Sequence, residues 1–182
     1  MINLYLVNIK NENNYSQVFQ RYILAKKLDI KKDEIKIARS EYGKPYLINY
    51  TNIHFNVSHT IDAIICAISE ENIGVDIERI KSFNMGVVQK YFTKQEQNYI
   101  FKEKEKQNER FVEVWTRKEA YVKWTGKGMK VSFQSFDTLK DKKIFSFNIK
   151  GYFISLCSNC FTSSKPEELL NFIGIPQELL LK

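Results

Sequence analysis

Two carboxylates stand two residues apart in the segment Gly-Val-Asp-Ile-Glu at positions 74–78. Apolar and acidic residues alternate here, and a period of two places Asp76 and Glu78 on the same face of a β-strand. Carboxylates this close repel each other, and a hard divalent cation such as Mg²⁺ relieves that repulsion. The same alternation also describes an ordinary amphipathic strand with one wet face. The spacing alone therefore predicts the strand and leaves the metal open.

A third carboxylate and a lysine lie on a predicted helix. The segment 115–124 is rich in helix-forming residues, and two glycines follow it. Glu119 and Lys123 are four residues apart and therefore neighbours on one face, with Lys118 beside them. A surface ion pair contributing about 0.3–0.5 kcal/mol is the commoner meaning of that spacing. Together with the two strand carboxylates, however, Glu119 would complete a donor set suited to Mg²⁺.

A serine and a histidine, Ser58 and His59, follow a stretch that is typical of a strand. A Ser-His pair at the end of a strand is often a cap or a turn. Hydrolase chemistry is disfavoured, because the chain has no Gly-x-Ser-x-Gly segment and adjacent residues do not easily adopt nucleophile–base geometry. The residues alone leave two interpretations open, a turn and a binding pair.

These side chains need a scaffold, and the hydropathy pattern predicts one of α+β type. Apolar residues at helical spacing indicate a helix over 15–28, and a capping box that begins at Thr93 opens another. We expect a connector over 81–88 and a short final helix over 166–172. Strands are predicted over 2–9, 35–38, 53–57, 61–68, 73–80, 129–133, 144–149 and 152–157.

The composition is that of a globular chain of 182 residues with 43% hydrophobic residues and a formal net charge of +7. No apolar run approaches the roughly 18–20 residues of a membrane helix, and the first residues lack a signal-peptide pattern. We therefore expect a cytoplasmic protein without a membrane partner. The positive charge favours polyanionic partners. Three cysteines, Cys66, Cys157 and Cys160, form neither a disulfide framework nor a zinc site.

Four motifs follow one another along roughly residues 21–135. They are Gly43-Lys44-Pro45, Phe55-Asn56-Val57-Ser58-His59, Gly74-Val75-Asp76-Ile77-Glu78, and Trp115 to Lys123 followed by Gly126 and Gly128. In this order they resemble the 4'-phosphopantetheinyl transferases, specifically the larger single-chain class typified by the surfactin-synthetase-activating enzymes. Each motif alone is a weak signal, and the four in sequence are specific.

The resemblance implies transfer of the 4'-phosphopantetheine group from coenzyme A to a serine of an acyl- or peptidyl-carrier protein, releasing adenosine 3',5'-bisphosphate. It implies Mg²⁺, or Mn²⁺ in its place, held by Asp76, Glu78 and Glu119 at the pyrophosphate. Glu119 is the leading candidate for the general base, and Glu78 or a metal-bound water are the alternatives. Lys123 would meet a phosphate oxygen as charge moves to the leaving group, and Lys118 would assist.

The resemblance also implies a coenzyme A site. Gly43, Lys44 and Pro45 would lie along its adenosine end with Lys44 near a phosphate, while Ser58 and His59 would bind phosphates, His59 the 3'-phosphate. The larger class has a longer N-terminal segment, with lysines and an Arg-rich stretch that help to hold the 3'-phosphate, and most of that segment is missing here. We expect its place to be taken by Arg21, or by Lys26 or Lys27.

At the level of the whole chain, the resemblance implies two similar α/β halves related by a pseudo-twofold, each a small, mostly antiparallel sheet packed on helices. We expect residues 1–73 to carry coenzyme A-binding elements and residues 74–182 to carry the metal and catalytic motifs, with both halves packed as one unit. A monomer is expected, because this class completes its site within one chain.

An acidic carrier protein would dock on a basic rim, and the segment 81–106, with Phe83, Met85 and Val87, is the expected contact surface.

One alternative is a non-enzymatic basic protein that binds nucleic acid or an acidic partner. The chain has none of the aromatic or zinc-finger patterns of nucleic-acid readers, which argues against nucleic acid. A metal-dependent phosphohydrolase could use the same carboxylates, but it would not need the Gly-Lys-Pro and Ser-His motifs in this order.

Overall fold

The elements of the chain are known from a computed structural model that describes residues 1–9, 15–162 and 170–174. The strands are β1 Ile2–Asn8, β2 Ile37–Arg39, β3 Pro45–Leu47, β4 His54–Thr60, β5 Ala63–Ser69, β6 Gly74–Arg79, β7 Ile144–Ile149, β8 Tyr152–Cys157 and β9 Leu170–Gly174. The α-helices are α1 Tyr15–Leu28, α2 Met85–Tyr91, α3 Lys94–Phe101 and α4 Gln107–Thr125. Short 3₁₀ turns are η1 Lys32–Glu34, η2 Lys104–Lys106, η3 Gly128–Lys130, η4 Phe133–Ser135 and η5 Asn159–Thr162. This mixture of helices and small sheets confirms the predicted α+β class.

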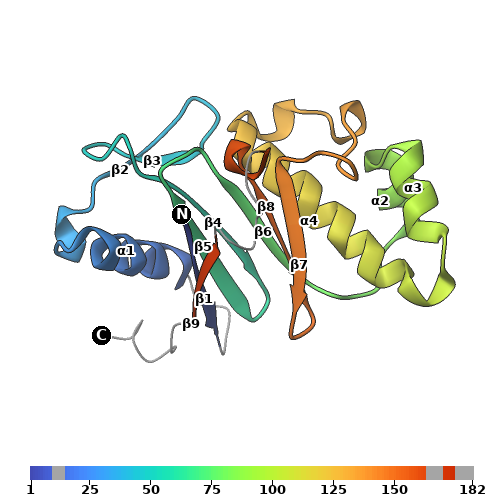
Figure 1. Cartoon of the computed structure of the whole chain (residues 1–182), viewed down its shortest axis with the longest axis horizontal. Helices are drawn as coiled ribbons and strands as arrows, with labels where there is room; N and C mark the ends of the chain where they lie inside the picture. Colours follow the sequence, from blue (N-terminus) through green and yellow to red (C-terminus); the bar gives the residue numbers. More distant parts are fainter. Residues whose placement is uncertain (10–14, 163–169, 175–182) are drawn as a thin grey trace.

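The first sheet has the strand order β4-β5-β1-β9. Strand β1 is antiparallel to β5 and parallel to β9, and β5 is antiparallel to β4. Strand β5 is buried along its whole length because both of its faces are covered. One face packs against Phe19, Ile23 and Leu24 of α1, and the other faces the second sheet. In Figure 1, α1 lies on the left beside this sheet.

The second sheet has the order β6-β8-β7 and is antiparallel throughout. The long helix α4 packs against β6 and β8. In Figure 1 it runs diagonally past the strands of this sheet, with α2 and α3 at the right of the view. Apolar residues of β6 and β8 join residues of β1 and β5 in one cluster, among them Leu4, Ile65, Ile77 and Ile154. The two sheets therefore share a core. The helices in the part of the chain described here include none that is both long and apolar enough to span a membrane.

Helix α4 lies unusually close to β6, and Gly74 makes this possible. A Cβ atom at Gly74 would stand 2.0 Å from the carbonyl oxygen of Ala120 and 2.5 Å from the amide nitrogen of Trp124. No side chain fits in that space. The close approach brings the carboxylates of β6 beside the residues of α4.

Several expected boundaries are wrong, and tertiary contacts explain why. Strand β4 continues to Thr60, because its ladder with β5 runs through the last residue. Ser58 and His59 are therefore strand residues instead of turn residues. The expected connector over 81–88 already contains the start of α2, whose first turn is capped by Asn84 through a hydrogen bond from the Gly86 amide.

Two further expectations at the C-terminal side are also wrong. The segment 129–133 is not a strand, because it includes the last two residues of η3 and the first residue of η4. Gly128, which begins η3, has a positive φ of 56°. Residues 170–172 belong to β9 instead of a helix, because they pair with β1. The remainder of that expected helix, residues 166–169, lies outside the described residues.

Candidate active site

Lys123 joins two of the other motifs at one point. Its Nζ lies 2.6 Å from Asp76 Oδ1 and 2.9 Å from Ser58 Oγ, and the Ser58 hydroxyl itself donates to Asp76 Oδ1 at 2.6 Å. These residues come from α4, β6 and β4. Three of the sequence motifs thus meet in a single hydrogen-bonded group, as expected for residues of one site.

Strands β4 and β6 belong to different sheets, and alternate polar residues connect them. The Val75 amide donates to Asn56 Oδ1 at 2.9 Å, and Thr60 Oγ1 donates to Glu78 Oε2 at 3.2 Å. Ser58 lies between Asn56 and Thr60 on the same face of β4. Sequence reasoning singled out Ser58, quoted Asn56 only as part of its motif without giving it a role, and missed Thr60. The period-two spacing around Ser58 was the signal that could have found them.

Glu119 lies one turn before Lys123 on α4, and it interacts electrostatically with both carboxylates of β6. Burial raises the pKa of Glu119, as do the charges of Asp76 and Glu78, while Lys123 lowers it. Glu78 is also held from the opposite direction by Lys81, whose Nζ lies 3.0 Å from Glu78 Oε2. The site therefore gathers more negative than positive charge around Glu119.

The donor set suits a hard divalent cation, although it is not a preformed metal centre. Nowhere in residues 1–9, 15–162 or 170–174 do three His, Cys, Asp or Glu side chains form a group that could hold a metal ion as they stand. Besides burial, the charges of Asp76 and Glu78 raise the pKa of Glu119, so both carboxylates of β6 act on Glu119 electrostatically. Carboxylate oxygens are the ligands that Mg²⁺ prefers. The chemistry of Asp76, Glu78 and Glu119 thus fits Mg²⁺.

A cavity of about 770 Å³ opens beside this group. Glu119 and Lys123 line it together with Tyr42 and the turn Gly43-Lys44-Pro45. Three further aromatic residues, Tyr91, Trp115 and Phe133, also line it. Their rings contact one another, with Trp115 and Phe133 centroids 5.7 Å apart. The cavity thus combines charged and aromatic lining residues beside the carboxylates.

A second cavity of about 810 Å³ shares Pro45, Asn56 and Val57 with the first. It is lined by His59 and Arg39, and by Glu78 near the carboxylate group. Neither of these two cavities is lined by Arg21, Lys26 or Lys27, the bases expected to hold the 3'-phosphate. The Arg21 guanidinium instead donates to the Ile35 carbonyl at 2.9 Å.

Lys44 has its ammonium group turned into the protein. Its Nζ donates to Asn72 Oδ1 at 2.5 Å, to the Ile73 carbonyl at 3.1 Å and to the Trp124 carbonyl at 3.2 Å. All three ammonium protons have acceptors, and burial lowers the pKa of Lys44 to about 8. Lys44 thus caps the last turn of α4 and does not point a free charge toward a phosphate.

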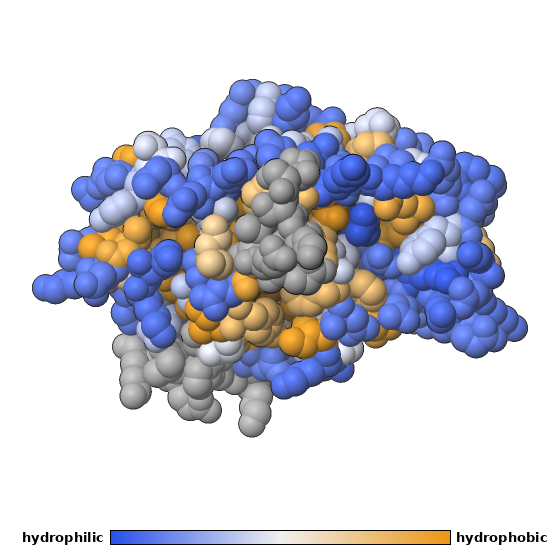
Figure 2. Space-filling model, viewed as in Figure 1, coloured by the Kyte–Doolittle hydropathy of each residue, from blue (hydrophilic) through white to orange (hydrophobic). Residues whose placement is uncertain are grey.

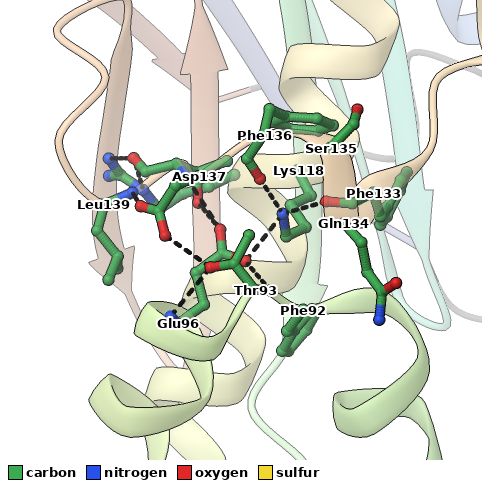
Figure 3. Close-up of polar contacts among 12 residues, drawn as sticks. Phe92, Thr93, Glu96, Lys118, Phe133, Gln134, Ser135, Phe136, Asp137 and Leu139 are labelled. Carbon is green, nitrogen blue, oxygen red and sulfur yellow. Dashed lines mark hydrogen bonds and ion pairs between the residues drawn. The ribbon is translucent and has the colours of Figure 1, made fainter.

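Lys118 does not join the site, which corrects the expectation that it assists Lys123. Its side chain is fully buried and pairs with Glu96, Nζ to Oε2, at 2.8 Å (Figure 3). Burial lowers the pKa of Lys118, and the bond to Glu96 opposes that change. Glu96 was recognised only as the last residue of the capping box, which the structure confirms.

Comparison with known proteins gives matches along most of the chain. Residues 72–168 match the model of the 4'-phosphopantetheinyl transferase superfamily, and residues 10–71 match an N-terminal 4'-phosphopantetheinyl transferase model. The chain is 36% identical over 135 residues to the 4'-phosphopantetheinyl transferase gsp of Aneurinibacillus migulanus, covering 71% of this chain and 55% of the relative. It is 35% identical over 120 residues to ffp of Bacillus subtilis, covering 65% and 54%.

A more distant relative is the human L-aminoadipate-semialdehyde dehydrogenase-phosphopantetheinyl transferase, 30% identical over 132 residues that cover 64% of this chain and 43% of that protein. The chain spans about half the length of the curated relatives it matches. The superfamily match includes β6 and α4, which carry the carboxylates and Lys123. The chain belongs to the 4'-phosphopantetheinyl transferase superfamily.

Proposed function

We propose that this chain transfers the 4'-phosphopantetheine group from coenzyme A to a serine of an acyl- or peptidyl-carrier protein and releases adenosine 3',5'-bisphosphate. The observation that carries the proposal is the group in which Lys123 contacts both Asp76 and Ser58 beside a cavity that Glu119 lines. Membership of the superfamily supports it. A basic binding protein would not need Glu119 in electrostatic contact with Asp76 and Glu78 beside that lysine.

Asp76, Glu78 and Glu119 would hold Mg²⁺, with Mn²⁺ as a possible replacement. An ion held by these carboxylates would supply charge neutralisation at the pyrophosphate and Lewis-acid activation of the phosphoryl group. The electrostatic contact of Glu119 with Asp76 and Glu78 supports this assignment, because a divalent cation would relieve the repulsion between Glu119 and the two strand carboxylates.

The protein residues supply alignment, charge and a proton acceptor. The carrier serine oxygen forms a bond to the phosphorus of the phosphopantetheine group, while the bond from that phosphorus to the bridging oxygen breaks. Glu119 takes the serine proton, and Glu78 is the alternative base. Lys123 meets the developing charge on the leaving phosphate, and its side chain is 26% exposed and can reach a ligand in the cavity.

The adenosine end of coenzyme A would follow the Gly43-Lys44-Pro45 turn toward His59. We place the 3'-phosphate beside His59 and Arg39 instead of Arg21, since both line the cavity that adjoins the carboxylates. Arg39 is exposed, and one of its guanidinium nitrogens donates to the Gly43 carbonyl at 2.9 Å, which leaves other donors for a phosphate. Lys44 supports the turn between the cavities through its bonds to α4.

The carrier protein would dock over α2 and the start of α3. Met85 is 50% exposed there, and Lys90 and Lys94 are exposed as well. The end of the molecule that carries α3 is mostly hydrophilic on the face shown in Figure 2. An acidic carrier surface with an apolar centre would complement this arrangement.

The test is the intact mass of an apo carrier protein after incubation with this chain, coenzyme A and Mg²⁺. We expect a gain of one phosphopantetheine group, which a chelator abolishes. The variant Asp76→Ala should keep its circular dichroism spectrum and lose the transfer. Absence of transfer to several carriers, together with absence of coenzyme A binding, would reject the proposal in favour of a binding protein.

A further inference from the structure

The buried pair Lys118–Glu96 lies at the centre of a polar network that the reaction does not use directly. Both side chains have no exposed surface. Besides Glu96, Lys118 Nζ donates to the carbonyl oxygens of Phe133 and Phe136 at 2.6 and 2.8 Å (Figure 3). All three ammonium protons are therefore used, two of them on the backbone of one loop.

Glu96 holds the other end of the same loop. Its Oε1 accepts hydrogen bonds from the amide and the hydroxyl of Thr138 at 3.0 and 2.9 Å. Its Oε2 accepts from the Thr93 amide at 2.9 Å, and the Thr93 hydroxyl donates to Asp137 Oδ2 at 2.6 Å. Segment 133–138, which we call the wall loop, is thus fixed at both ends to α4 and to the first turn of α3.

The wall loop forms part of the lining of the first cavity, the one of about 770 Å³. The Phe133 ring lines the cavity that Glu119 and Lys123 also line, and its centroid lies 5.7 Å from that of Trp115 and 6.0 Å from that of Tyr91. Phe136 points back into the protein, where it stacks on Tyr121 at 4.4 Å and lies beneath the Lys118 ammonium. A shift of the loop would therefore move Phe133 relative to Trp115.

A buried ion pair is a poor source of stability, because desolvation cancels much of its Coulomb attraction. Apolar residues could fill the same volume, but they could not hold two backbone carbonyls and a threonine amide at fixed positions. The network is therefore better suited to fixing the position of a loop than to holding the fold together.

We propose that Lys118 and Glu96, although they lie outside the transferase site, are positioning residues that act on it through the wall loop and hold Phe133 against Trp115. This inference rests on the proposed function for its kinetic consequence. Its structural consequence, the position of Phe133 beside Trp115, can be measured without any substrate.

The main test is the double variant Lys118→Met with Glu96→Gln, which removes both charges together and leaves no unpaired buried ion. The double variant is compared with a reference protein that has neither of these two changes. Both proteins also carry Trp124→Phe, so that Trp115 is the only tryptophan in each. The matched control is Thr116→Val, which removes a buried hydroxyl on α4 that bonds to Ser155, away from the cavity.

We expect the double variant to remain folded by circular dichroism while acrylamide quenches Trp115 about twofold more strongly. The KM for coenzyme A should rise about tenfold, since small misplacements in a site are costly. Thr116→Val should lower the melting temperature without either effect. A folded double variant with unchanged quenching and unchanged KM would overturn the proposal.

Phe133→Ala provides a second test that leaves the buried pair intact. If the double variant does not fold, this variant alone tests whether the wall loop acts on the site through Phe133. It should reproduce both the quenching and the rise in KM, and an unchanged KM would reject the role of the wall loop. If the unmodified chain neither binds coenzyme A nor transfers the group, the proposed function fails. The quenching of Trp115 still tests the positioning in that case.

Discussion

At the scale of single residues, Lys123 and its neighbours show how the site balances charge. One ammonium group faces the carboxylates that surround Glu119, and it shares its hydrogen bonds between Asp76 and a serine hydroxyl. Lys118, only five positions earlier, has the same ammonium group, but it pairs with Glu96 and contacts neither Asp76 nor Ser58. Successive helix residues point roughly 100° apart, so Lys118 enters the core while Glu119 reaches the cavity. Spacing predicted the pair Glu119–Lys123, but only tertiary burial separates the two lysines.

The variant Lys123→Met tests the proposed role of Lys123, which is to meet the developing charge on the leaving phosphate. We expect kcat to fall about 10²–10³-fold, as when one preorganised donor to a developing oxyanion is removed. Asp76 keeps its bond from Ser58, so the circular dichroism spectrum should not change. Steady-state rates of carrier modification measure the effect, and a loss of less than about tenfold would contradict the assigned role.

The variant Glu119→Gln should have opposite effects on activity and stability. Because the pKa of Glu119 is raised in the folded chain, the unfolded chain binds fewer protons between the ordinary glutamate pKa and the raised one, and stability falls as pH increases through that window. At pH 7 without divalent ions, Glu119→Gln should therefore be about 0.5–2 kcal/mol more stable than the original chain. Urea unfolding in chelator measures this difference.

Two conditions sharpen the same measurement. The advantage of Glu119→Gln should shrink as the pH is lowered toward the ordinary glutamate range, since Glu119 is then protonated in both states. Saturating Mg²⁺ should also remove the advantage, because the original chain binds the ion more tightly. A stabilising effect that is independent of both pH and Mg²⁺ would argue against a shared carboxylate site.

At the scale of elements, the position of α4 against β6 determines whether the motifs meet. The capping box of α3 and the glycine end of α4 are local signals, and they were predicted correctly. Gly126 ends α4 with a positive φ of 69°. The wall loop was not predicted, because its backbone follows the carbonyl contacts to Lys118, which lies 15 residues from Phe133. Local propensity carries no information on such a contact.

The variant Gly74→Ala tests the close approach of the two elements. The new methyl group would overlap backbone atoms of Ala120 and Trp124, which cannot move as a flexible side chain would. We expect a loss of about 1–3 kcal/mol or more in the free energy of unfolding, and loss of transfer as α4 moves away. Gly174→Ala is the matched control, because its Cβ would meet nothing within 4 Å. Equal stability of both variants would refute the steric argument.

At the scale of the whole molecule, the formal charge of +7 is the property most relevant to a partner. Composition predicted a polyanionic partner but not its place, since the place depends on which bases stay exposed in the fold. Lys118 is buried and Lys81 pairs with Glu78, whereas Lys90 and Lys94 remain exposed beside Met85. The pseudo-twofold and the boundary between residues 73 and 74 remain predictions.

Charge reversal at Lys90 and Lys94 tests the docking surface. The double variant Lys90→Glu with Lys94→Glu should raise the KM for the carrier protein about tenfold at low salt, and less at high salt because ions screen the attraction. The KM for coenzyme A should change less. Reversal of Lys26 and Lys27 at the end of α1 is the control of equal charge. An equal effect of both variants would point to general attraction instead of a defined surface.

The pairing of β9 with β1 also has a consequence for how the chain acquires its structure during synthesis. Asn171 bonds to Asn3 across 168 positions of sequence, and Ile2 pairs with Leu170. Strand β1 is synthesised long before β9, and its outer edge is therefore covered only after residues near position 174 have been made. Until then β1 presents unpaired amides and carbonyls to other nascent chains, and the charged and polar residues elsewhere on the surface do not protect that edge.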